Sequence, residues 1–341
     1  MSKTLIVHIG AGKTGTSSIQ AALTENEQIL AKHKIRYLGM VLENGQKTYS
    51  WQYPEGSVDL FDLDALRQQN EVFNVLSSEL TADDGANVLV WSNEWMFGRH
   101  DSFIPALTAI KGLGYTVKII CYVREHGSWS RSAYEQWGIN NKAYSGRVKS
   151  YREYFKVRPI RFMADVSPWL VSFGPDVGLR NFDCRDDIVG DFFSVLGINH
   201  ACPKPRANKR LKPEELLARA IFNNASTSPT PPKLLRCFRP QNLHPVISSE
   251  SLMNSLLPTA EDIEWVRNDS AEDLKGLNRI LESCGEPPLQ YDDISDSGFV
   301  IDQDALNMLL LKLLACQERR ILELDNKLAA AVKACESDER N

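Results

Sequence analysis

The stretch LIVHIGAGKTGTSSIQAAL, residues 5–23, decides the fold of this chain. Residues 4–9 form an apolar run suited to a buried strand, residues 10–15 form a glycine-rich turn, and a helical pattern of apolar residues begins at Ser17. A helix that begins directly after such a turn points several backbone N–H groups outward, and its dipole favours negative charge. The stretch therefore predicts an anion-binding loop whose natural occupant is a phosphate or sulfate group.

The side chains of this loop also suit an anion. Its three glycines, Gly10, Gly12 and Gly15, let the backbone approach a ligand closely, and Lys13 adds a positive charge. Hydroxyl donors follow at Thr14, Thr16, Ser17 and Ser18. The nucleotide triphosphatase loop G-x-x-x-x-G-K-[ST] requires a glycine where this chain has Val7, and no acidic strand end suited to Mg²⁺ is evident. These differences disfavour a metal-dependent triphosphatase.

Outward from this stretch, apolar runs alternate with helical patterns. Strands are predicted at 35–39, 87–92, 116–123 and 177–183, and helices at 17–32, 63–80, 101–113, 127–138 and 186–198. Such alternation implies a parallel sheet covered by helices on both faces. The sequence therefore predicts an α/β fold with a loop insertion at residues 41–60 and a mostly helical C-terminal part.

The C-terminal part contains further helical patterns. Pro213 starts one helix, residues 259–284 are interpreted as two short helices, and a long helix runs from Asp302 onward. Apolar residues of the last helix fall on alternating four- and three-residue steps: Leu310, Leu314, Ile321, Leu324, Leu328 and Ala331. This spacing favours either a coiled-coil contact in a homo-oligomer or an amphipathic helix packed on its own domain. The predicted divisions are a core over 1–225, a helical extension of the same domain over 226–300, and the long helix over 301–341.

Composition narrows the function classes. The 341 residues are 43% hydrophobic and 24% charged, with a formal net charge of −5, so a packed core is expected and a nucleic-acid partner is not. Seven cysteines without a C-x-x-C pair fit reduced thiols better than a disulfide framework or a zinc site. No signal peptide or apolar stretch of membrane-spanning length is apparent, and we expect a cytoplasmic protein with no membrane span.

A second anion pocket is predicted about 110 residues after the first. In IICYVREHGSWSRSAYEQW, residues 119–137, Arg124 follows a buried strand and Ser132 lies eight residues further, in the predicted helix. Ligands gather at the carboxyl ends of parallel strands, and a planar guanidinium can hold a phosphate through two hydrogen bonds. The alternative interpretation is that Arg124 caps the turn or pairs with Glu125.

These motifs resemble those of sulfotransferases that use 3′-phosphoadenosine 5′-phosphosulfate (PAPS). Lys13–Ser17 is similar to the loop that binds the 5′-phosphosulfate in that superfamily, and Arg124 with Ser132 is similar to its 3′-phosphate site. RDDIVGDFFSVLGI (185–198) and RANKRLKPEELLARAIFN (206–223) resemble segments of bacterial members, so the resemblance spans roughly residues 3–225. It implies a P-loop-like fold, PAPS as co-substrate and no metal. The implied nucleotide-binding residues are Gly12, Lys13, Thr14, Gly15, Thr16, Ser17, Arg124 and Ser132, with Asn208, Lys209 and Arg210 in a basic lid.

The resemblance also implies a reaction, the transfer of a sulfuryl group to an acceptor hydroxyl or amine. Lys13 is then placed to stabilise the bridging oxygen of the leaving phosphate, by analogy with phosphoryl transfer. SNEW, residues 92–95, resembles the S-x-E pattern of the branch with a glutamate base, which makes Glu94 the expected general base and His100 the reserve candidate. His8 and His126 are interpreted as structural.

The same resemblance favours a glycan or glycolipid acceptor over another small molecule, because the glutamate branch often acts on carbohydrates. Aromatic residues with faces suited to sugar rings are Tyr49, Trp51, Tyr53, Trp95, Trp137, Tyr144 and Tyr151. Two other functions remain open from the sequence. One is a magnesium-dependent P-loop kinase or nucleotide hydrolase, and the other is a non-catalytic sulfotransferase-fold module kept for assembly.

Overall fold

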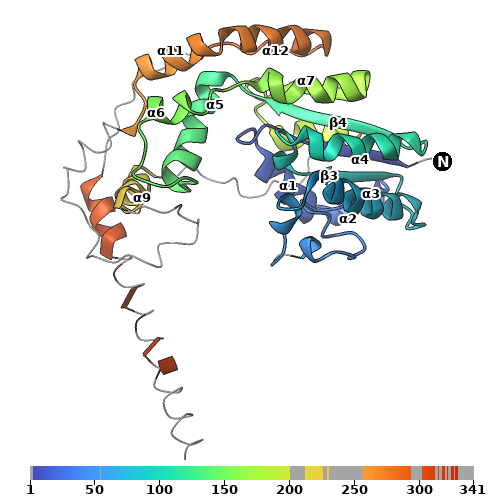
Figure 1. Ribbon diagram of the computed structural model, residues 1–341, viewed down its shortest axis with the longest axis horizontal. Helices are drawn as coiled ribbons and strands as arrows, with labels where there is room; N and C mark the ends of the chain where they lie inside the picture. The colour runs from blue at the N-terminus through green and yellow to red at the C-terminus, as the bar shows by residue number, and fades with distance from the viewer. Residues whose placement is uncertain are drawn as a thin grey trace, which may run out of the picture. The chain divides into compact units, whose positions relative to one another are not determined.

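A computed structural model describes residues 3–53, 55–199, 212–225, 256–292 and 302–311, together with Pro229 and scattered positions between 314 and 328 (Figure 1). The chain groups into two compact units. The first comprises Met1–Ala133, Arg158–Lys209 and Ile263–Asp293, and the second comprises Tyr134–Val157, Arg210–Asp262 and Ile294–Asn341. This grouping is one of contacts in space, and the predicted divisions along the sequence stay a prediction.

The first unit is built on a five-stranded sheet in which all strands run parallel. The strands are β1 (Thr4–His8), β2 (Ile35–Tyr37), β3 (Val88–Ser92), β4 (Thr116–Val123) and β5 (Val177–Asn181). Their order across the sheet is β2-β3-β1-β4-β5. The chain leaves β1 towards β2 on one side, whereas it leaves the neighbouring strand β4 towards β5 on the other. The α/β prediction is confirmed, and the β1–β4 junction is a topological switch point, where ligands of such sheets bind.

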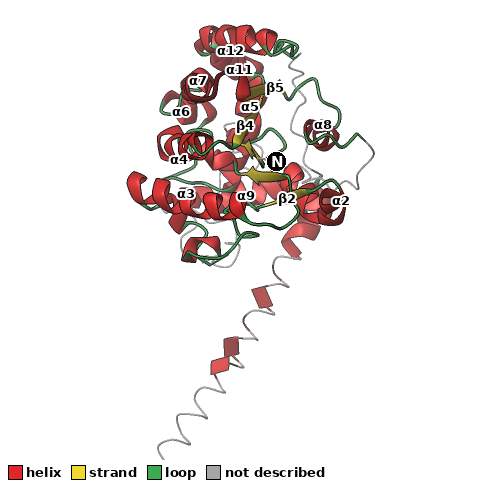
Figure 2. Ribbon diagram, turned by 90° about the vertical axis from the view of Figure 1, so that its right-hand side faces the viewer, coloured by secondary structure: helices red, strands yellow, loops and turns green. Residues whose placement is uncertain are grey.

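Helices cover both faces of the sheet (Figure 2). On one face lie α1 (Thr16–Glu25), α2 (Glu27–Lys32) and α8 (Ile188–Val195), and on the other lie α3 (Ala65–Thr81), α4 (His100–Gly112) and α7 (Phe162–Phe173). Successive side chains of β1 point to opposite faces of the sheet, so this strand packs against both helix layers. Ile6 belongs to the cluster under α1 and α8, whereas the neighbouring residues Leu5 and Val7 are buried outside that cluster.

The predicted helix over residues 17–32 is two helices in the structure. Asn26 interrupts it, with φ −112° and ψ 25°. Its backbone N–H and its side-chain Nδ2 both donate to the carbonyl of Ala22, at 3.0 and 2.8 Å. An asparagine side chain that bonds to nearby backbone competes with helix continuation, which accounts for the break.

Helix α5 (His126–Ala133) follows β4 closely, and its first turn is capped by a buried carboxylate. Glu125 accepts hydrogen bonds from the backbone N–H groups of Gly127 and Ser128, at 2.7 and 2.8 Å. Arg267, in α11 (Ala260–Asp269), pairs with the same carboxylate at 3.3 Å. Helix α12 (Ala271–Ser283) packs against α7 and β5, so a segment late in the chain covers this side of the first unit.

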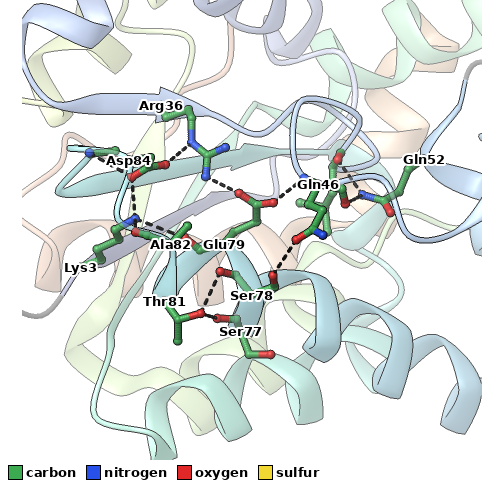
Figure 3. A network of polar contacts seen from close by, with 12 residues as sticks. Lys3, Arg36, Gln46, Gln52, Ser77, Ser78, Glu79, Thr81, Ala82 and Asp84 are labelled. Atoms are coloured by element: carbon green, nitrogen blue, oxygen red, sulfur yellow. Dashed lines mark hydrogen bonds and ion pairs between the residues drawn. The ribbon is translucent and has the colours of Figure 1, made fainter.

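Among its described residues, the predicted insertion at 41–60 has the short 3₁₀ turn η1 (Ser50–Gln52), and a second, η2 (Asp59–Phe61), begins at its end. Figure 3 shows how polar contacts tie it to the end of α3. Glu79 is buried there and accepts from Arg36 and from the backbone N–H of Gln46. Asp84 in turn pairs with Arg36 at 2.9 Å and with Lys3 at 2.7 Å. The insertion is therefore anchored to the sheet rather than loose.

The second unit includes α6 (Tyr151–Lys156), α9 (Pro213–Ala225) and a π-helix, Tyr134–Asn140, that follows α5 directly in the sequence. Aromatic rings fill its interior: Tyr134 contacts Tyr151 and Tyr154 at centroid distances of 5.3 and 5.6 Å. Lys142 is buried against α9, where its ammonium donates to the carbonyl of Asn223 at 2.9 Å. Burial lowers the pKa of Lys142.

The tail begins as predicted. Asp302 caps the helix, because its Oδ1 accepts from the backbone N–H groups of Asp304 and Ala305, each at 3.0 Å, and residues 303–311 are helical. In the part of the chain that is described, no helix combines the length and apolar character needed to cross a bilayer.

Candidate functional site

The loop between β1 and α1 carries the first cluster of predicted site residues. Gly15 has φ +83° and Lys13 has φ +69°, a left-handed conformation that a lysine adopts only at a cost of about 1–3 kcal/mol. Among the backbone hydrogen bonds of the described turns and loops, none is donated by the N–H groups of Gly12, Gly15, Thr16 or Ser17. The Thr14 hydroxyl donates to the carbonyl of Ala11 at 2.5 Å and so fixes the turn. These donors lie together at a helix N-terminus, which suits a tetrahedral oxyanion.

Two buried polar atoms lie against the same loop. His8 Nε2 and Thr16 Oγ1 have no hydrogen-bond partner within the described residues. A Cβ atom at Gly10 would lie 2.9 Å from the first and 3.0 Å from the second, so the glycine leaves the space between them open. On its other side the His8 ring bonds through Nδ1 to Ser92 Oγ at 2.8 Å. Burial lowers the pKa of His8 to about 3, so its ring is neutral.

Arg124 lies at the carboxyl end of β4, where the sequence predicted it. Its carboxylate partner is Asp183, just beyond β5, with an Nε–Oδ1 distance of 3.1 Å. The alternative pairing with Glu125 is wrong, because that carboxylate is used by the first turn of α5 and by Arg267. The guanidinium also lies over the ring of Phe182, 5.3 Å from its centroid.

Two aromatic side chains bring the loop and Arg124 together. Phe182, which stacks on Arg124, has Cε2 only 3.3 Å from where a Cβ at Gly15 would lie. Trp129, one turn before Ser132 in α5, donates from its indole nitrogen to the carbonyl of Gly12 at 2.6 Å. The loop, the end of β4 and α5 therefore meet at the switch point of the sheet.

The predicted base is linked to α1 by an amide side chain. Gln20 donates from Nε2 to Glu94 Oε2 and to the carbonyl of Ser92, both at 3.1 Å. Because Gln20 is one turn after Thr16 and Ser92 bonds to His8, this carboxylate belongs to the same group of contacts as the loop. Glu94 is half-buried and begins the turn η3 (Glu94–Met96) after β3. The reserve candidate His100 begins α4 and bonds to Asp101 at 2.9 Å.

The other predicted residues are distributed differently. Asn208, Lys209 and Arg210 lie outside the described residues. Among the predicted aromatic faces, Trp51 and Tyr151 are buried in packing, whereas Trp95 is 42% exposed beside Glu94 and contacts Phe61 at 4.6 Å. The described part of the chain contains no group of three or more His, Cys, Asp or Glu side chains arranged to hold a metal ion.

The sequence interpretation missed several residues of this site. Gln20, Trp129, Phe182 and Asp183 carry no motif that marks them, and their roles follow from contacts between segments far apart in the chain. The interpretation of His8 as structural stays a prediction, and its burial and its bond to Ser92 agree with it.

No protein-family model matches the sequence of this chain. A comparison with curated proteins also finds no match.

Proposed function

We propose that this protein is a PAPS-dependent sulfotransferase that transfers a sulfuryl group to an acceptor hydroxyl or amine. The observation that carries the proposal is the meeting of two cationic sites at the β1–β4 junction: the loop with Lys13 and the guanidinium of Arg124. PAPS carries phosphate groups at two separated positions, so it needs two such sites. A single anion would need only the loop.

The loop residues suit the 5′-phosphosulfate. Backbone N–H groups from Gly12 to Ser17, the Lys13 ammonium and the hydroxyls of the first turn of α1 would hold it. Arg124, with Ser132 one turn beyond Trp129, would hold the 3′-phosphate. Lys209 and Arg210 remain proposed lid residues on the strength of the sequence resemblance alone.

In the proposed reaction the acceptor oxygen or nitrogen attacks sulfur in line with the bond to the bridging phosphate oxygen. The new bond to sulfur forms as that S–O bond breaks, and adenosine 3′,5′-bisphosphate leaves. Lys13 stabilises the charge that develops on the leaving oxygen. The acceptor proton passes to Glu94, which Gln20 holds near the loop.

A carbohydrate hydroxyl is the proposed acceptor, supported by the resemblance to the glutamate branch and by the exposed ring of Trp95 next to Glu94. Trp95 also lies near Arg99, whose guanidinium is 5.6 Å from the indole centroid. A cytoplasmic location is part of the proposal and is supported by the cysteine pattern of the sequence.

A thermal-shift comparison of three ligands tests the proposal: adenosine 3′,5′-bisphosphate, ATP with Mg²⁺, and GTP with Mg²⁺. A ligand at a hundred times its Kd stabilises the native state by about 2.7 kcal/mol, so binding raises the Tm. We expect the bisphosphate to raise the Tm of the wild type, and not of Lys13→Ala or Arg124→Ala. Lys111→Ala removes a surface ion pair with Asp176 instead and is the control that keeps the shift.

The three ligands separate the alternatives. A larger shift with a magnesium nucleotide than with the bisphosphate would favour a kinase or nucleotide hydrolase. No shift with any of them would favour a non-catalytic assembly module, and either result would contradict the proposed function.

A further inference from the structure

Arg124 does not lie alone at the end of β4, and its surroundings are acidic. Asp183 accepts from Arg124 Nε at 3.1 Å through one carboxylate oxygen and from the backbone N–H of Glu125 at 2.7 Å through the other. Asp292 also faces this site and accepts from the Ser128 hydroxyl at 3.2 Å. A site that only binds phosphate would gain nothing from these carboxylates, because each repels the ligand.

The geometry gives Asp183 a role in aiming the guanidinium. Its bond engages only the Nε edge of Arg124, while the Phe182 ring lies under the plane of the group. The hydrogen bond from Arg124 to a described side chain is made by Nε and leaves the two terminal nitrogens unused by it. These nitrogens form the edge that binds a phosphate through two parallel hydrogen bonds.

The same carboxylate is suited to exchange a proton when an anion arrives. Its side chain is 16% exposed, and burial together with the nearby charge of Asp292 and Glu125 raises the pKa of Asp183, against the opposing effects of the Glu125 N–H and Arg124. Glu125 is itself paired with Arg267, so the carboxylates that share the charge of Arg124 are Asp183, which pairs with it directly, and the nearby Asp292. A phosphate dianion bound to Arg124 would add negative charge beside Asp183 and would weaken its ion pair.

We propose that Asp183 is a positioning residue that holds Arg124 by Nε, and that it takes up a proton when a phosphate group binds to the terminal nitrogens of Arg124. The proposal rests on the proposed function for the ligand, a phosphate of the nucleotide. Its consequence is that nucleotide binding is linked to proton uptake at Asp183.

The sign of the pH dependence follows from this linkage. Bound phosphate raises the pKa of Asp183 further, so the complex holds more protons than the unliganded protein. The contribution of Asp183 to affinity is therefore present at low pH and is lost as the pH rises through the pKa of the complex. The ligand also titrates near pH 6, which affects every variant equally and cancels in a ratio of dissociation constants.

The test measures the Kd of adenosine 3′,5′-bisphosphate by isothermal titration calorimetry from pH 5 to pH 8, for the wild type and Asp183→Asn. The amide still accepts from Arg124 Nε but cannot take a proton. We expect the ratio of wild-type Kd to variant Kd to rise with pH, by about tenfold for each unit by which phosphate raises the pKa of Asp183. Asp183→Ala should bind more weakly than Asp183→Asn at every pH, because nothing then holds the guanidinium.

Asp176→Asn is the matched control, since Asp176 is an ion-paired aspartate at the opposite end of β5. It should follow the pH profile of the wild type. Calorimetric titration of the wild type in buffers of different ionisation enthalpy gives the number of protons taken up on binding of the bisphosphate. This measurement needs no variant, so it does not depend on how well a variant folds. Tight binding with no proton uptake beyond that of the ligand, or equal profiles for wild type and Asp183→Asn, would overturn the role of Asp183 alone. Absence of bisphosphate binding by the wild type at every pH would overturn the proposed function as well.

Discussion

At the scale of single residues, His8 occupies the most constrained position in the site. Its ring is fully buried, contacts Phe192 at a centroid distance of 5.2 Å, and bonds to Ser92 on one side only. A neutral imidazole has one donor and one acceptor nitrogen, and its tautomer follows from the bond that the other nitrogen makes. If Ser92 donates to Nδ1, then Nε2 carries the hydrogen and becomes a donor beneath the anion loop.

The burial of His8 predicts an acid-sensitive stability. In the unfolded chain a histidine takes a proton near pH 6.5, whereas the native ring takes one only near pH 3. The free energy of unfolding should therefore fall as the pH drops below 6.5, by at most about 1.4 kcal/mol per pH unit from this residue. Urea unfolding at pH 7, 6 and 5 measures the slope.

His8→Asn should reduce that slope between pH 6.5 and pH 5. The variant His33→Asn, which changes an exposed histidine at the end of α2, is the control and should keep it. Carboxylates whose pKa is lowered by native contacts, such as Asp84 and Asp191, lose their contribution at more acidic pH, as they are protonated below the ordinary aspartate range. An unchanged slope in His8→Asn would show that the ring does not resist protonation.

The proposed role of Glu94 as the general base predicts a loss of turnover without a loss of nucleotide binding. Glu94→Gln keeps the size of the side chain and an oxygen that can accept from Gln20, but it removes the base. We expect sulfuryl transfer to fall by a factor of about 10²–10⁴ while the Kd of the bisphosphate changes little. Steady-state kinetics measures the turnover, and calorimetry on the same preparation measures the Kd of the bisphosphate. Normal turnover would refute the assignment, and His100→Asn then tests the reserve candidate.

At the scale of elements, the strands and most helices could be predicted because their patterns are local. Strand β4 has the predicted bounds, 116–123, and the anion loop lies where its glycines indicated. The helix break at Asn26 and the helix α7 were missed. The first depends on one side-chain contact, and the second carries an internal proline, Pro168, which in a sequence favours a helix boundary.

Only those parts of the site whose residues lie within one short segment of the chain could be predicted from the sequence. Arg124 and the loop could each be identified from the spacing of residues within one short segment. Asp183 contacts Arg124 only because β5 lies beside β4 in the sheet. Trp129 likewise reaches Gly12 across 117 positions of the chain. Contacts of this kind are set by strand order, which a single sequence does not specify.

The bond from Trp129 predicts a coupling between α5 and the anion loop. Trp129→Phe keeps an aromatic ring against Phe162 but removes the indole donor to Gly12. We expect the Kd of the bisphosphate to rise by about fivefold, since a lost hydrogen bond that fixes the loop corresponds to about 1 kcal/mol. Trp169→Phe, which removes an indole bond to Phe97 elsewhere, is the control. Equal affinities in the two variants would mean that α5 does not position the loop.

At the scale of the whole molecule, the tail provides a separate prediction. Several apolar side chains of the predicted seam are exposed, with Leu314 at 66% and Leu328 at 64%. Of the two interpretations of this helix, the contact between copies is the one that a mass measurement tests directly, and for it we expect a homo-oligomer. Light scattering after gel filtration should give a mass above that of one chain, 38.4 kDa, and Leu314→Lys with Leu328→Lys should reduce it to one chain. Gln303→Lys, on the exposed first turn, is the control, and a monomeric wild type would contradict the prediction.

The strand order β2-β3-β1-β4-β5 is what assembles the site, because it places the loop after β1 beside Arg124 after β4. The central claim is that these two neighbouring positions bind the two phosphate groups of one nucleotide. This claim concerns geometry, so a structure of the complex tests it more directly than any rate.

The decisive measurement is a crystal structure of the protein with adenosine 3′,5′-bisphosphate. The account predicts the 5′-phosphate within hydrogen-bonding distance of the backbone N–H groups of residues 12–17, and the 3′-phosphate on the terminal nitrogens of Arg124. Density for the nucleotide elsewhere, with Arg124 still bound only to Asp183 and no phosphate in the loop, would contradict it.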